Sequence, residues 1–277
     1  MILLAEPGWL DTKRLLSVSN QIVIYVDNPI LTPIFSGMSI YLQVEPEAVI
    51  KAQDYLLKNY KLYDYILTFN EAVLDGCPNS VKYIYGTTWI SPLVWSSIHT
   101  ERKRFEVSTI IGNKFATPGH LFRKAVYTAQ DSLPKGIPYR FFKSIHNPPR
   151  LFSTSNDCYF KDPSPEGKSE VFLDSQFHLV IENSRQNNYF TEKLCDCLIT
   201  KTIPIYYGCP NISEYFNTDG WIILESNSIS ELSEKLSALT PEYYSKYSNI
   251  IQQNFFTTMY YMDIYANINK ALKNLNL

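Results

Sequence analysis

The sequence predicts an α/β fold made of two successive domains and a helical tail. Short apolar runs typical of buried strands alternate along the chain with patterns typical of amphipathic helices. A polar and charged stretch over 96–105 interrupts this alternation, and the pattern is helical from residue 241 onward. We therefore expect an N-terminal domain over 1–104, a second domain over 105–240 and a tail over 241–277 that packs back across the domains.

The elements follow from the same patterns. In the first domain, strands are expected over 1–5, 21–26, 39–44, 63–69 and 81–86, and helices over 46–60 and 70–76. In the second domain, strands are expected over 106–112, 138–144, 176–183, 202–208 and 220–224, and helices over 118–133, 190–201 and 228–239. The stretch over 147–168 is rich in Pro, Ser and Asn, and it predicts a long loop.

Composition and charge exclude several classes of protein. The net charge of −2, from 25 Lys+Arg against 27 Asp+Glu, offers no basic surface for nucleic acid. No run approaches the roughly 20 apolar residues of a membrane-spanning helix, and the N-terminus lacks the form of a signal peptide. The five cysteines are an odd number in a long chain, which argues against a disulfide scaffold. We expect a cytoplasmic protein without a transmembrane segment.

One stretch between two apolar runs, ENSRQNNYFTEKL over 182–194, is crowded with hydrogen-bonding side chains. It leaves a predicted strand and enters a predicted helix, and a helix N-terminus attracts phosphate. Lys193 adds a positive charge there, and the Glu192 carboxylate suits the hydroxyl pair of a sugar. Tyr189 offers a ring for stacking, and Asn183 can hold the loop or contact a ligand. These groups together could bind a nucleotide with a sugar attached.

A purely structural interpretation of the same stretch stays open. Thr191 and Glu192 at the start of a helix are residues that capping alone favours. A polar connection between a strand and a helix is also ordinary in α/β folds.

The segment over 177–216 resembles the donor-binding motif of the α1,3/4-fucosyltransferases, glycosyltransferase family 10. It contains a strand ending in Glu-Asn-Ser, a Tyr six residues after that Asn, the pattern Tyr-x-Thr-Glu-Lys, and then Ile-Pro-Ile-Tyr-Tyr-Gly-Cys-Pro. Ile181 stands where the family has the second Phe of the strand. The resemblance implies a GT-B fold, in which two Rossmann-like domains face a central cleft. The first would bind the acceptor and the second the nucleotide-sugar donor.

The resemblance also implies residue roles. Asn183, Tyr189, Glu192 and Lys193 would line the nucleotide-sugar site. The helix over 118–133 is similar to the family helix that bears an Arg paired with the diphosphate, and this Arg would be Arg123. A guanidinium group can donate two hydrogen bonds to one phosphate. The alternative for Arg123 is an exposed helical residue without a ligand.

The catalytic base and the metal requirement are expected from weaker signals. Glu45 precedes the strand similar to the family's acidic motif, and Glu6 and Glu71 are rivals at other strand ends. The chain has no Asp-x-Asp pattern, and its histidines lack ligand spacing. We therefore expect no metal and no other cofactor, with cationic side chains stabilising the leaving group. His178 alternates with apolar residues in a strand and is expected to be structural.

The implied function is transfer of L-fucose from GDP-fucose to a hydroxyl group of a glycan acceptor, with inversion at the anomeric carbon. A different donor such as UDP-xylose, or a catalytically dead carbohydrate-binding or assembly protein, are the alternatives. Without an anchor, the chain resembles the soluble bacterial or viral members of the family. The sequence names neither the acceptor, the linkage, nor the oligomeric state.

Overall fold

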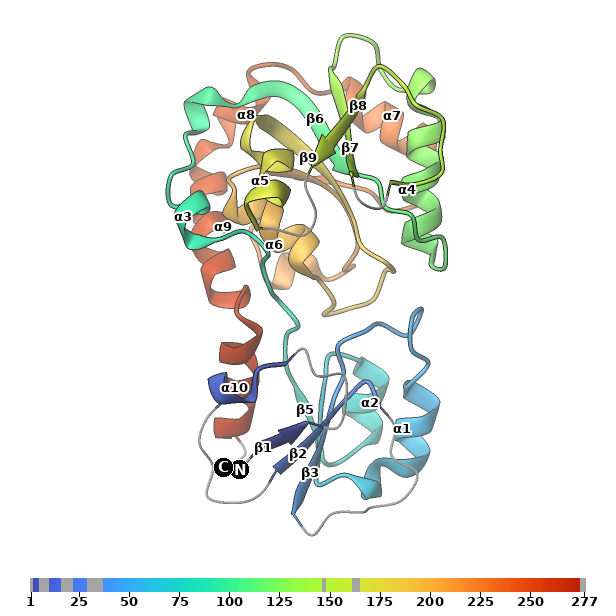
Figure 1. The fold of residues 1–277 in the computed structure, drawn as a ribbon, viewed down its shortest axis with the longest axis vertical. Helices are drawn as coiled ribbons and strands as arrows, with labels where there is room; N and C mark the ends of the chain where they lie inside the picture. The colour runs from blue at the N-terminus through green and yellow to red at the C-terminus, as the bar shows by residue number, and fades with distance from the viewer. Residues whose placement is uncertain are drawn as a thin grey trace. The chain divides into compact units, whose positions relative to one another are not determined.

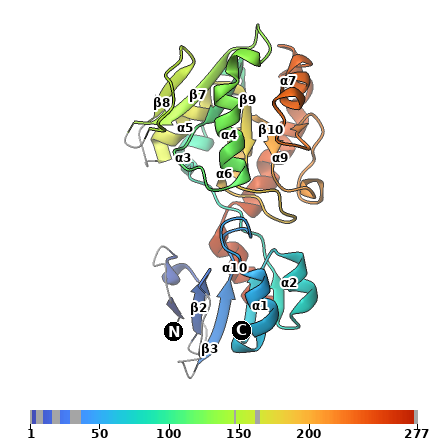
Figure 2. The same ribbon diagram turned by 90° about the vertical axis from the view of Figure 1, so that its right-hand side faces the viewer.

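The computed structural model divides into two compact units. It describes residues 2–4, 10–15, 22–28, 37–145, 148–160 and 165–274. Unit 1 comprises Met1–Gly86, Gln186–Tyr189 and Asp263–Leu277, and unit 2 comprises Thr87–Arg185 and Phe190–Met262. The two units appear in Figures 1 and 2. No helix among the described residues is long and apolar enough to span a bilayer.

Unit 1 contains a parallel five-stranded sheet whose strands follow chain order. The strands are β1 Ile2–Leu4, β2 Ile22–Val26, β3 Met38–Leu42, β4 Tyr65–Thr68 and β5 Ser80–Lys82. The helices are η1 Thr12–Arg14, α1 Gln53–Asn59, η2 Tyr60–Leu62, α2 Glu71–Gly76 and α10 Ile264–Asn274. Helix α1 is shorter than the predicted 46–60, because the N–H groups of Val49 and Ile50 both bond the Pro46 carbonyl in a tight turn.

Helices cover both faces of the unit 1 sheet, as Figure 1 shows. Successive side chains of a strand point to opposite faces. Ile22 and Ile24 pack in one cluster with the apolar side of α10, whereas Val23 and Tyr25 pack in the other with α1 and α2. Buried on both sides, β2 therefore has the unbroken apolar sequence of a central parallel strand.

Unit 2 contains a six-stranded parallel sheet in the order β11-β10-β9-β6-β7-β8. Its strands are β6 Arg104–Ile110, β7 Tyr139–Ser144, β8 Asp157–Phe160, β9 Ser175–Ile181, β10 Ile203–Tyr207 and β11 Ile222–Ile223. Its helices are α3 Pro92–Trp95, η3 Thr100–Arg102, α4 Pro118–Thr128, η4 Gln130–Ser132, α5 Pro165–Leu173, α6 Glu192–Ile199, η5 Ile212–Glu214, α7 Ile229–Ser237, α8 Tyr243–Lys246 and α9 Ser248–Tyr261.

The strand order of unit 2 reverses between β6 and β9. From β6 the chain proceeds outward to β7 and β8, and then returns to place β9 on the other side of β6. Such a switch point opens a crevice beyond the carboxyl ends of the two strands, where open α/β sheets bind ligands. Figure 2 shows α4 lying along this sheet.

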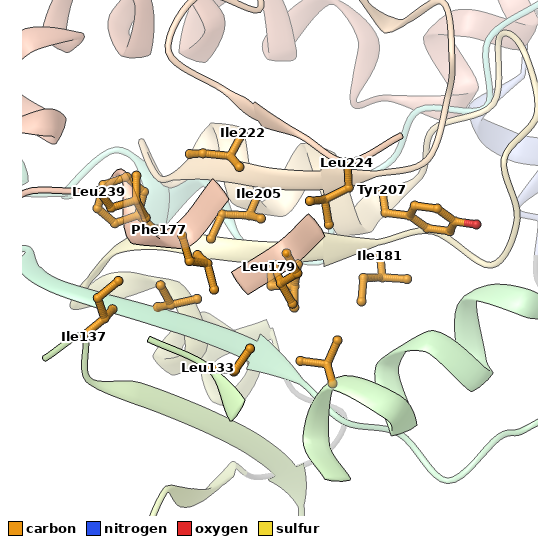
Figure 3. Close-up of a cluster of buried hydrophobic side chains, with 14 of the residues drawn as sticks. Leu133, Ile137, Phe177, Leu179, Ile181, Ile205, Tyr207, Ile222, Leu224 and Leu239 are labelled. Carbon is orange, nitrogen blue, oxygen red and sulfur yellow. The ribbon is translucent and has the colours of Figure 1, made fainter. Parts of the chain in front are cut away.

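A large hydrophobic cluster of unit 2 lies on one face of its sheet. Phe177, Leu179 and Ile181 alternate along β9 and point to the same side as Ile205 and Tyr207 of β10, as Figure 3 shows. Apolar residues of α4 and α7 complete this cluster. The opposite face of β9 meets α5, where the Phe172 ring lies 4.5 Å from the ring of His178.

The stretch over 147–168 is not one long loop. It contains β8 and the beginning of α5. Strand β8 pairs with β7, and the buried ammonium of Lys143 on β7 lies 2.8 Å from the carboxylate of Asp157 on β8. Tertiary pairing therefore produces a strand where the composition predicted a loop.

The limits of the two units also differ from the predicted domains. Residues 87–104 lie in unit 2, where the buried carboxylate of Asp196 on α6 accepts hydrogen bonds from Thr88 and the backbone of Trp89. Helix α10 lies in unit 1, since its apolar side covers that sheet. The predicted tail is therefore divided, with α9 in unit 2 and α10 in unit 1.

Candidate functional site

A pocket of about 120 Å³ lies at the switch point of the unit 2 sheet. Apolar side chains from the ends of β6 and β9 and from α5 form much of its wall. Its charged residues are Arg123, Lys168, Glu192 and Lys193. Three cations and one carboxylate beside the ends of parallel strands form a site suited to an anionic ligand that also has polar groups.

Arg123 reaches the pocket from α4. One guanidinium nitrogen donates a 2.8 Å hydrogen bond to the side-chain oxygen of Asn183, which follows β9. The start of α4 is held by the same strand end, because the Gly119 N–H donates to the Asn183 carbonyl at 3.0 Å. A side chain at Gly119 would lie 1.7 Å from the Glu182 carbonyl oxygen, so this close approach requires glycine.

Glu192 and Lys193 occupy the first turn of α6. Thr191 caps this helix by accepting a hydrogen bond from the Lys193 N–H. The Lys193 ammonium lies 2.8 Å from the Glu192 carboxylate. Burial alone would raise the pKa of Glu192, but the charges of Lys193 and Lys168 outweigh it and lower the pKa to about 2. Glu192 is therefore ionised in the pocket at neutral pH.

Glu182 is a structural clamp rather than a pocket residue. Its side chain is fully buried at the end of β9. One carboxylate oxygen accepts the Thr191 N–H at 2.9 Å, and the other accepts the Thr191 hydroxyl at 2.8 Å. Burial raises the pKa of Glu182. These two hydrogen bonds hold the end of β9 against the start of α6, and so they fix the positions of Glu192 and Lys193.

The middle of the same connection, Gln186–Tyr189, belongs to unit 1. The Gln186 side-chain oxygen accepts the Glu47 N–H at 3.2 Å. The Asn187 amide donates to the Glu71 carboxylate at 2.9 Å, and the Asn188 amide donates to the other oxygen of that carboxylate at 3.4 Å. Much of the polar character of the segment over 182–194 is thus used in holding the chain.

Tyr189 lies in the core of unit 1. Its side chain is 2% exposed, and its ring centroid lies 5.1 Å from that of Phe69. The predicted ligand contact of Tyr189 stays a prediction, and the structure shows its ring enclosed by apolar neighbours instead of lining the unit 2 pocket.

Glu45, the predicted base, follows β3 in unit 1 and is partly exposed. Its position is set by Asp27, a residue whose role was not predicted from the sequence. The two Asp27 carboxylate oxygens accept the backbone N–H groups of Val44 and Glu45, each at 2.9 Å. Burial raises the pKa of Asp27 to about 7, although these two N–H groups lower it. The sequence signal that could have identified Asp27 is its position directly after an apolar strand.

The structure describes only one of the two alternative candidates for the catalytic base, Glu71 and Glu6. Glu71 begins α2, where its carboxylate holds Asn187 and Asn188. Its contacts are those of a structural residue. Glu6 lies outside the described residues.

Two further pocket residues were not predicted as such. Lys168 lies in the stretch expected to be a loop, and α5 brings it to the pocket. His178, expected to be structural, also lines the pocket, while its Nδ1 lies 2.8 Å from the Ser108 hydroxyl. Burial and the nearby Lys168 and Lys103 lower the pKa of His178 to about 3, so the imidazole is neutral.

Within the described part of the chain, no group of three or more His, Cys, Asp or Glu side chains could hold a metal ion. Independence from metal stays a prediction for the reaction itself.

Comparison with known proteins gives a family match in the region of the pocket. Residues 153–265 match the model of the C-terminal region of glycosyltransferase family 10 (fucosyltransferase). The α-(1,3)-fucosyltransferase FucT of Helicobacter pylori is 35% identical over 57 residues. This similarity covers 21% of the present chain and only 12% of that relative. The resemblance found in the motif is thereby confirmed.

Solved structures confirm the GT-B fold predicted for the chain. A crystal structure of an α1,3-fucosyltransferase has a TM-score of 0.52 at 15% identity, covering 99% of this chain and 86% of that one. An α,α-trehalose-phosphate synthase (UDP-forming) from Burkholderia xenovorans has a TM-score of 0.60 at 9% identity, covering 93% and 72%. TarM has a TM-score of 0.57 at 10% identity, covering 93% and 55%. At these identities the similarities show the fold alone.

Proposed function

We propose, from the match of residues 153–265 to the C-terminal region of glycosyltransferase family 10, that the chain is an inverting glycosyltransferase that transfers L-fucose from GDP-fucose to a hydroxyl group of a glycan. The observation that carries the proposal is the unit 2 pocket. It combines Lys193 and Glu192, expected from the donor motif, with Arg123, expected from the similar upstream helix, at the switch point of a parallel sheet.

The chemistry of the pocket fits a nucleoside diphosphate sugar. The guanidinium of Arg123, oriented by Asn183, would donate to phosphate oxygens. The positive end of α6 would favour the same charge. Glu192 is ionised and would accept hydrogen bonds from the ribose hydroxyls. Each of these groups has a chemical reason to be present in a donor site.

The reaction requires one proton transfer and one leaving group. An acceptor hydroxyl would attack the anomeric carbon on the face opposite the diphosphate, so that the new C–O bond forms as the bond to the phosphate oxygen breaks. Glu45 would take the hydroxyl proton as general base. The departing GDP gains negative charge, which the cations of the unit 2 pocket would stabilise. Because the carbon is attacked from the back, its configuration inverts.

The test is a transfer assay in EDTA. The protein is incubated with GDP-fucose and a panel of glycan acceptors, and NMR of the product gives the anomeric configuration of the transferred sugar. We expect a fucoside of inverted configuration. A product of retained configuration contradicts the mechanism, and transfer from UDP-xylose alone contradicts the donor. The absence of transfer from either donor, with both bound, favours the dead carbohydrate-binding protein.

A further inference from the structure

We propose that Lys168 is a further diphosphate-binding residue of the unit 2 pocket, whose ammonium group contacts the phosphate oxygens together with Arg123 and Lys193. The inference rests on the proposed function, because it names a further cation of that donor site that would hold the leaving group. It concerns a residue that the sequence motif does not include.

The Lys193 ammonium is already surrounded by acceptors of its own chain. Its Nζ lies 2.8 Å from the Glu192 carboxylate, 3.3 Å from the Thr191 hydroxyl and 3.9 Å from the Glu182 carboxylate. An ammonium group has three N–H donors. The Glu192 carboxylate and the Thr191 hydroxyl occupy two of them, so Lys193 keeps one N–H group for a phosphate oxygen.

The Lys168 ammonium has fewer acceptors than Lys193 among the described residues. Among the described residues, its close acceptor is the Asp196 carboxylate at 2.9 Å, and it also lies 5.5 Å from the centre of the Trp89 ring. Its side chain is 20% exposed and lines the pocket. Within the described part of the chain, two of its three N–H groups thus have no acceptor and can bind a ligand.

Asp196 anchors Lys168 at the pocket wall. Its carboxylate is fully buried on α6, and its other oxygen accepts the Thr88 hydroxyl at 2.7 Å and the Trp89 N–H at 2.8 Å. With the carboxylate held by these donors, the long Lys168 side chain has one fixed attachment point. Pre-organisation of this kind reduces the entropy lost when a ligand binds.

The electrostatic balance of the pocket supports the same assignment. Lys193 is paired with Glu192, which itself lines the pocket, whereas Asp196, the partner of Lys168, is not one of the residues that line it. The charge of Lys168 reaches the pocket interior, since it contributes to lowering the pKa of both Glu192 and His178.

The test measures binding of GDP, UDP, guanosine and inorganic pyrophosphate by calorimetry. Lys168→Met alone would leave the Asp196 charge buried without its partner. The comparison is therefore between Asp196→Asn and the double variant Lys168→Met/Asp196→Asn, with circular dichroism to show that both fold. We expect the double variant to bind GDP and pyrophosphate about tenfold more weakly than Asp196→Asn, the loss of one charged hydrogen bond. Guanosine binding stays the same.

Two further variants serve as controls. Lys168→Arg preserves the charge and should retain GDP affinity within about threefold. Lys246→Met removes an exposed lysine of the same unit and should leave binding unchanged.

Each outcome separates the inference from the proposed function. Equal binding of GDP and pyrophosphate by Asp196→Asn and the double variant overturns the role of Lys168 and leaves the donor assignment standing. Loss of pyrophosphate binding in the double variant, in a protein that prefers UDP to GDP, supports Lys168 and contradicts the fucosyl donor. A wild-type protein that binds neither GDP nor pyrophosphate overturns both.

Discussion

At the scale of single residues, the polar segment over 182–194 serves two purposes. Glu182, Asn187 and Asn188 hold the chain, because their side chains bond the backbone or other side chains within their own unit. Glu192 and Lys193 line the pocket. Both purposes favour the same residue types, because hydrogen bonds to unpaired backbone groups and hydrogen bonds to a ligand use the same side-chain donors and acceptors. Sequence alone could not separate them.

Glu45 gives the first prediction at this scale. Glu45→Gln keeps the size of the side chain and removes the proton acceptor, so kcat should fall by about 10²–10⁴-fold. GDP-fucose affinity, measured by calorimetry, should be unchanged. The control is Glu71→Gln, which weakens the contacts to Asn187 and Asn188 and should lower thermal stability more than kcat. A large loss of kcat in Glu71→Gln with normal kcat in Glu45→Gln would contradict the assignment.

Asp27 gives a prediction on pH. Its carboxyl pKa is raised from 3.8 to about 7 in the folded chain, so between these values the folded protein holds a proton that the unfolded chain has released. The free energy of unfolding then falls as pH rises through this range. Asp27→Asn removes the ionisation. Urea unfolding at pH 5 and pH 8 should show wild type losing stability relative to Asp27→Asn, and a gain at the higher pH would refute this.

At the scale of elements, the start of α4 lies close against the end of β9. The first turn of α4 meets the Glu182 carbonyl, and the same contact aims Arg123 at Asn183. The helix was predictable from its pattern and from Pro118, which opens it. The close approach was not, because a glycine near a helix start has several explanations in a sequence.

The corresponding prediction compares two glycines. Gly119→Ala places a methyl group against backbone at 1.7 Å, so α4 must move. We expect GDP affinity to fall about tenfold through the displaced Arg123, together with a lower midpoint of thermal unfolding. Gly112→Ala is the matched control, since its Cβ meets nothing within 4 Å, and it should change stability by less than about 0.5 kcal/mol. Equal behaviour of the two variants would contradict the role given to the contact.

At the scale of the whole molecule, the local sequence pattern predicted where the strands lie better than it predicted which segments belong to each unit. Strands such as β2, β4 and β10 have apolar runs that are visible within a few residues. Three features escaped because they depend on distant partners: Gln186–Tyr189 belongs to unit 1, α10 covers the unit 1 sheet, and β8 pairs with β7. Lys168 was also not predicted as a site residue, because it lies with β8 in a stretch whose Pro and Ser content predicted a loop.

The measurement that tests the central claim most directly is calorimetric titration of the protein with GDP-fucose and with UDP-xylose, each in EDTA. The account predicts that GDP-fucose binds without metal and that UDP-xylose binds much more weakly. Arg123→Gln should lose most of the GDP-fucose affinity, because it removes a charged donor to the diphosphate. Binding of UDP-xylose alone, or GDP-fucose binding that Arg123→Gln leaves intact, would contradict the claim that the unit 2 pocket is a GDP-fucose site.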